Sequence, residues 1–155
     1  MDVKKEHFMQ KALRQANVAL RKGEVPVGAI VVSSEGTVLA RAHNAIEQHD
    51  CQIAHAEVLA IKKACKKMGG WRLNGCWIYV TLEPCLMCLG LIQLSRIKGV
   101  IFGAQSNLFG CKLSDGPPPR YTQGLSIEGG VKAEESIALL QAFFKKVRRE
   151  KEKGK

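Results

Sequence analysis

The chain carries AHAE at positions 54–57 and TLEPCLMC at positions 81–88, which together offer one imidazole, two thiols and a nearby carboxylate. A catalytic zinc ion takes three protein ligands and keeps a fourth position for water, whose pKa it lowers toward neutrality. His55, Cys85 and Cys88 are three ligands of suitable softness. The pattern therefore predicts a site for one zinc ion per chain, with Glu57 free to move protons as general acid and base.

This site places a requirement on the fold. Residues i and i+2 of a regular helix diverge by about 200°, so His55 and Glu57 converge only if a helix begins there. Cys85 and Cys88, at i and i+3, share a helical face, and Pro84 suits the first helical position. We therefore expect two helix N-termini to point at the metal, an arrangement that favours cysteine thiolates.

Each half of the pattern is weak by itself. A lone His-x-Glu is usually a solvated helix start, and a lone Cys-x-x-Cys is equally a redox pair or part of a structural zinc site. The ordered combination H-x-E…P-C-x-x-C is far more specific, because it is the known signature of the zinc deaminases that act on nucleobases.

Further stretches extend this match over almost the whole chain. They are EVPVGA at 24–29, SRI at 95–97, VIFGA at 100–104, FF at 143–144 and RR at 148–149. With these, the chain resembles the bacterial tRNA-specific adenosine deaminases, which convert the wobble adenosine of a tRNA anticodon to inosine.

The resemblance implies an α/β fold, a three-layer αβα sandwich with a mixed, mostly five-stranded sheet, cytidine deaminase-like. It also implies a homodimer that binds the tRNA anticodon arm, with Glu57 as the catalytic residue. The substrate-binding residues that it suggests are Asn44, Val27, Ala56, Ser106, Phe144, Arg148 and Arg149. Three alternatives remain open: ordinary strand packing for Val27, a turn position for Asn44, and a solvated helix face for the two arginines.

Composition bounds the class of protein. The 155 residues fit one domain, 1–155, and the 46% hydrophobic content is enough to bury a core. The net charge of +10 favours a polyphosphate partner, although a merely soluble basic surface is the plainer alternative. Neither a secretory h-region nor a run of membrane-spanning length is present, and the six cysteines are scattered, so we expect a reduced, cytoplasmic protein without a membrane.

Periodicity predicts helices at 8–22, 54–68, 85–95 and 133–153, and strands at 25–32, 37–43, 77–80 and 98–102. The first two strands form a hairpin around the turn at 33–36, and the later strands pair in parallel. On the last helix Ile137, Leu140, Phe144 and Val147 are expected to face inward. The segment 104–124 is a long loop of unassigned role, in which Leu108 and Phe109 could pack or be exposed.

Two other functions fit parts of the pattern. A deaminase of a free base or nucleoside, such as guanine or cytidine, would keep the chemistry and change the substrate. A non-catalytic zinc module that binds RNA would need a fourth protein ligand, for which Cys51 or Cys111 is available.

One position departs from the resembled family. Familiar bacterial members carry Arg-Asp after Phe-Gly-Ala, with the Asp near the ribose of the target nucleotide, whereas this chain has Gln105 and Ser106. A neutral hydroxyl accepts a 2′-OH hydrogen bond more weakly than a carboxylate. We therefore expect this chain to discriminate less strongly against deoxyadenosine at the target position.

Overall fold

The computed structural model describes residues 2–108, 110 and 124–155, so Phe109, Cys111 and most of the 104–124 loop lie outside the described residues. Six elements precede the cysteine helix: α1 (Val3–Arg21), β1 (Gly28–Val32), β2 (Val38–His43), α2 (Ile46–His49), α3 (Ala56–Met68) and β3 (Trp77–Leu82). The cysteine helix is α4 (Leu86–Leu94), and three elements follow it: β4 (Gly99–Ala104), β5 (Ser126–Glu128) and α5 (Ala133–Lys153).

The strands form one mixed sheet in the order β2-β1-β3-β4-β5. The strand β1 pairs antiparallel with β2 and β3, while β3, β4 and β5 run parallel to one another. The predicted hairpin and the predicted parallel pairing are both confirmed. The short strand β5 and the single-turn helix α2 were not identified from the sequence.

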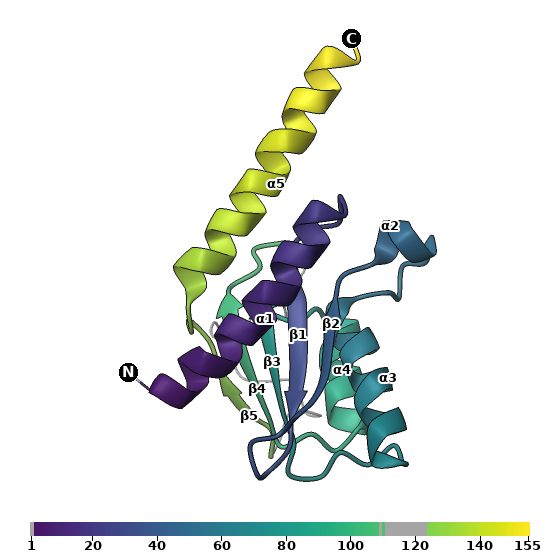
Figure 1. Cartoon of the computed structure of the whole chain (residues 1–155), viewed down its shortest axis with the longest axis vertical. Coiled ribbons are helices and arrows are strands. Elements are labelled where there is room, and N and C mark those ends of the chain that lie inside the picture. The colour runs from purple at the N-terminus through teal and green to yellow at the C-terminus, as the bar shows by residue number, and fades with distance from the viewer. Residues whose placement is uncertain (1, 109, 111–123) are drawn as a thin grey trace.

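Helices cover both faces of the sheet (Figure 1). On one face α3 and α4 pack over alternate strand residues such as Val31, Ile78 and Val100. On the other face α1 packs over the intervening residues, Ile30 and Tyr79 among them, with α5 beside it. Because both faces are covered, β1 is apolar and buried along its whole length, and the predicted three-layer αβα architecture is confirmed.

The first strand begins later than predicted. Residues 25–27 precede β1, which starts at Gly28. A proline cannot donate to a ladder, and β1 has partners on both sides, so it cannot include Pro26. Gly28 itself is required by packing, because a Cβ there would lie 2.0 Å from the carbonyl oxygen of Ala12 in α1.

The last helix has the predicted bounds but a different inward face. Ile137 and Phe144 are 42% and 46% exposed, whereas Ser136 is buried and Leu140 and Val147 are half-buried. The expected inward stripe is therefore wrong at two of its four positions. Phe144 belongs to the C-terminal half of α5, which projects past the sheet (Figure 1), whereas Ile137 lies near the start of the helix on a face that points to solvent.

No helix within the described residues combines the length and apolar character needed to cross a bilayer.

Candidate active site

The two segments that carry the metal-binding residue types meet at one edge of the sheet, each at a helix start. His55 is the N-cap of α3, and Cys85 is the N-cap of α4. Both have extended backbone conformations, and the side chain of neither caps its own helix. The predicted pair of helix N-termini is confirmed, except that Pro84 precedes the N-cap and does not occupy the first helical position.

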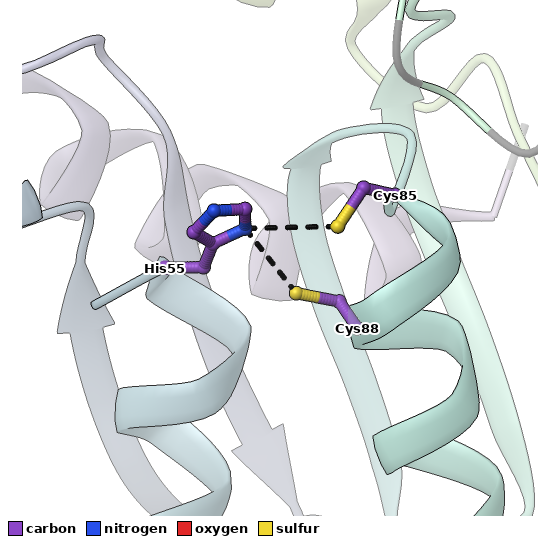
Figure 2. A group of neighbouring side chains, drawn as sticks. All are labelled: His55, Cys85 and Cys88. Atoms are coloured by element: carbon purple, nitrogen blue, oxygen red, sulfur yellow. Dashed lines mark hydrogen bonds between the residues drawn. The ribbon is translucent and has the colours of Figure 1, made fainter. Parts of the chain in front are cut away.

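The imidazole and the two thiols point toward one another (Figure 2). His55 Nδ1 lies 3.7 Å from Cys85 Sγ and 3.4 Å from Cys88 Sγ. Two ligands on a tetrahedral zinc ion, one nitrogen and one sulfur, are separated by about 3.5 Å when their bonds to the metal have normal lengths. Both nitrogen–sulfur distances therefore suit one zinc ion, and all three ligand atoms lie within 4.8 Å of one another.

Within the described residues, three side chains offer ligand atoms to a metal at this site. His55, Cys85 and Cys88 form the one group of metal-ligating side chains found within the described residues. Cys51 is exposed and is not part of that group, while Cys111 lies outside the described residues. Three protein ligands with a free fourth position are typical of catalytic zinc.

Glu57 lies beside this group as the second residue of α3. Its side chain is almost completely buried, and Oε2 lies 3.9 Å from His55 Nδ1. Burial raises the pKa of the carboxyl above its ordinary value, and this effect outweighs the opposing interactions with Cys88 and His55. A raised pKa suits a carboxylate that must accept a proton and release it near neutral pH.

The two cysteines are electrostatically different. Hydrogen bonding with Cys88, aided by His55, lowers the pKa of Cys85 to about 4. The interaction with the Cys85 thiolate, and burial, raise the pKa of Cys88. The hydrogen bond with Cys85 also raises the pKa of His55. The first thiol of the pair therefore loses its proton more readily than the second, and a coordinated divalent cation favours the thiolate form of both.

A cavity of about 420 Å³ opens over these residues. Of the suggested substrate-binding residues, the cavity is lined by Val27, Asn44, Ala56 and Ser106. Phe144, Arg148 and Arg149 lie exposed on α5 and do not line it. The structure thus brings four of the seven residues to the metal group and places three on a separate surface.

Six further residues line the cavity without having been singled out from the sequence: Val25, Ile46, Gln52, Leu82, Glu83 and Met87. Glu83 is buried, and its Oε1 accepts the backbone N–H of Ser106 at 3.2 Å. Gly110 packs against the same carboxylate, since a Cβ there would lie 2.3 Å from Glu83 Oε1. The position of Glu83 directly before Pro-Cys could have identified it as a site residue from the sequence, whereas nothing in the sequence distinguishes Ile46 or Gln52.

The chain is similar to known proteins over nearly its full length. The sequence model of the family described as the cytidine and deoxycytidylate deaminase zinc-binding region matches residues 2–104. A tRNA-specific adenosine deaminase of Bacillus subtilis is 44% identical over 94% of this chain and 92% of its own. One of Aquifex aeolicus is 45% identical over 93% and 96%. A solved structure from a study of A-to-I editing by tRNA:A34 deaminases at the wobble position superposes with a TM-score of 0.75, at 35% identity over 86% of this chain and 99% of that chain.

Proposed function

The chain belongs to the zinc-binding cytidine and deoxycytidylate deaminase family and, within it, to the tRNA-specific adenosine deaminases, and we propose that it converts the wobble adenosine of a tRNA anticodon to inosine by hydrolytic deamination. The observation that carries this proposal is the convergence of three zinc ligands and one buried carboxylate at the base of a cavity large enough for a purine.

Bound zinc would supply an activated water beside C6 of the base. Glu57 would pass one proton of that water to the ring nitrogen N1 as the water oxygen bonds to C6. It would then pass the second proton, from the new C6 hydroxyl group, to the amino group, so that the C6–N bond breaks, ammonia leaves and a carbonyl remains at C6. The 3.9 Å distance between Glu57 Oε2 and His55 Nδ1 supports this role, as does the composition of the metal-ligating group, which contains His55, Cys85 and Cys88 but not Glu57.

The walls of the cavity would bind the extruded base. Asn44 presents an amide that can both donate to and accept from a purine edge, and Val27 and Ala56 provide apolar contact. Ser106 lines the same cavity and would meet the ribose. Loop nucleotides are partly unstacked, so turning the target base out of an anticodon loop costs little.

Phe144, Arg148 and Arg149 would contact the anticodon arm outside the cavity. They are exposed on the projecting half of α5, where Lys145 and Lys146 add further positive charge. Phosphate neutralisation by such a segment would supply affinity without sequence readout.

We also propose that the single domain 1–155 functions as a homodimer in the cytoplasm, where tRNA is present. The dimer is supported by the apolar outer face of α4, where Leu86 and Leu94 are 61% and 68% exposed. Trp71 is half-exposed near the end of this helix, with Arg96 over its ring. Leu94→Lys should shift the protein toward monomer in analytical ultracentrifugation, and an unchanged mass would exclude this face of α4 as the dimer interface.

The decisive experiment is incubation of the zinc-loaded protein with a tRNA anticodon hairpin and, separately, with free adenosine, cytidine and guanine. Inosine at the wobble position, detected by sequencing, with no turnover of the free compounds, is the expected result. Turnover of a free base or nucleoside alone would support the small-molecule deaminase instead.

A further inference from the structure

Glu24 is a buried carboxylate that the proposed chemistry does not use. It lies between the end of α1 and the cavity, is 1% exposed, and forms no ion pair with any side chain in the described part of the protein. A charge in such a place requires strong hydrogen bonds, because an uncompensated buried carboxylate is costly.

The hydrogen bonds of Glu24 come from the start of α2. The backbone N–H of Glu47 donates to Oε1 at 2.6 Å and to Oε2 at 3.2 Å, and the N–H of Gln48 approaches Oε2 at 3.4 Å. These amides lie in the first turn of a helix, where they have no intrahelical acceptor. One side chain therefore fixes the start of an element 23 residues later in the chain.

The segment held in this way forms one wall of the cavity. The N–H of Asn44 donates to the carbonyl of Val27 at 2.9 Å, and that of Ala45 donates to the carbonyl of Ala54 at 2.9 Å. Ala54 directly precedes the metal ligand His55. Five residues of this wall line the cavity: Val25, Val27, Asn44, Ile46 and Gln52.

We propose that Glu24 is a positioning residue, which holds α2 and Asn44 at the distance from the zinc site that the target base requires. This inference rests on the proposed deaminase function. Glu24 does not line the cavity, so it acts through the wall and does not touch the base.

The test uses Glu24→Gln, which keeps the size of the side chain. Both carboxylate oxygens accept N–H groups, whereas a glutamine offers one acceptor and turns its amide nitrogen toward a donor. We expect the single-turnover rate at saturating hairpin to fall about 10- to 100-fold, because displacement of a positioning group by about 1 Å costs up to roughly 10²-fold. Hairpin affinity should change less than about threefold, since phosphate contacts dominate binding.

A matched control and a double-mutant cycle separate positioning from general damage. Glu35→Gln makes the same change at an exposed carboxyl in the hairpin turn and should leave the rate and the zinc content unchanged. In an Asn44→Ala background, Glu24→Gln should reduce the single-turnover rate by less than about threefold, because the effects of substitutions at coupled residues are not additive. Equal reductions of the rate in both backgrounds would overturn the proposal.

Hydrogen exchange gives a readout that needs no substrate. Amides of residues 44–49 should exchange at least about tenfold faster in zinc-loaded Glu24→Gln than in wild type, while those of α3 and β3 remain protected. Unchanged exchange at residues 44–49 would refute the positioning role even if the protein proved not to be a deaminase. If Glu24→Gln does not fold, Glu24→Asp carries the same tests, because it keeps the charge but withdraws it by one methylene.

Discussion

Replacement of Glu57 by glutamine tests the catalytic assignment most directly. The change preserves the volume of a side chain that is 4% exposed but removes its ability to carry a proton. General acid–base catalysis supplies ~10²–10⁴-fold, equivalent to about 2.7–5.5 kcal/mol of transition-state stabilisation. We expect a rate reduction at the upper end of this range. Among the described residues, the other carboxylate that lines the cavity is Glu83, which accepts the backbone N–H of Ser106 and is therefore not placed to substitute.

The same variant has a predicted effect on stability in the absence of metal. Burial raises the pKa of Glu57 in the folded state, so folding takes up a proton. The stabilising contribution of the protonated group is present below the ordinary carboxyl pKa and is lost as pH rises through the folded pKa. Metal-free Glu57→Gln should therefore gain stability relative to wild type as pH increases, by at most about 1.4 kcal/mol per pH unit over that interval.

Three measurements check these expectations. They are single-turnover deamination of an anticodon hairpin, zinc content by elemental analysis, and urea unfolding of metal-free protein at several pH values. Zinc should stay at one equivalent, because Glu57 is not a ligand in the proposed site. Loss of the metal in Glu57→Gln, or a rate within about tenfold of wild type, would refute the assigned role.

Four other predictions address the metal and the RNA. Cys85→Ala and Cys88→Ala should each lose zinc and activity together, and full activity in either would exclude the site. Because the pKa of Cys88 is raised, zinc binding releases its proton, and competition titrations should show affinity rising about tenfold per pH unit. Neutralising Arg148 and Arg149 should weaken hairpin binding and flatten its salt dependence by about 0.7–0.9 in slope for each phosphate that the protein no longer neutralises, with zinc content unchanged. Ser106→Asp should increase the preference for a ribose over a deoxyribose target nucleotide, and an unchanged preference would contradict the ribose contact.

The sequence was most informative where side-chain chemistry and helix starts coincide. The angular argument for His55 and Glu57 required a helix to begin between them, and α3 begins at Ala56. In the same way, the i, i+3 spacing of Cys85 and Cys88 predicted a helix that begins at these residues, and α4 begins directly after Cys85. Both inferences depend on local geometry, which a few consecutive residues specify.

Periodicity failed where burial depends on distant elements. The stripe on α5 has regular helical spacing, yet Phe144 is exposed because the helix continues past the sheet that would cover it. Apolar residues at 25–27 resemble a strand, but the ladders on both sides of β1 exclude Pro26. The three-residue strand β5 pairs with β4 across residues that are far apart in the chain, and it is too short for alternation to mark it.

The walls of the cavity are specified in a third way, through backbone groups that leave no trace in the sequence. The partners of Glu24 and Glu83 are amide N–H groups of Glu47, Gln48 and Ser106, which any non-proline residue would offer. The metal and proton chemistry can therefore stay fixed while the wall changes, because the two depend on different contacts. Differences in substrate among members of the cytidine and deoxycytidylate deaminase family should accordingly map to the segments equivalent to residues 24–27, 44–52 and 105–106. Exchanging those segments between members should alter substrate preference while zinc stoichiometry remains constant.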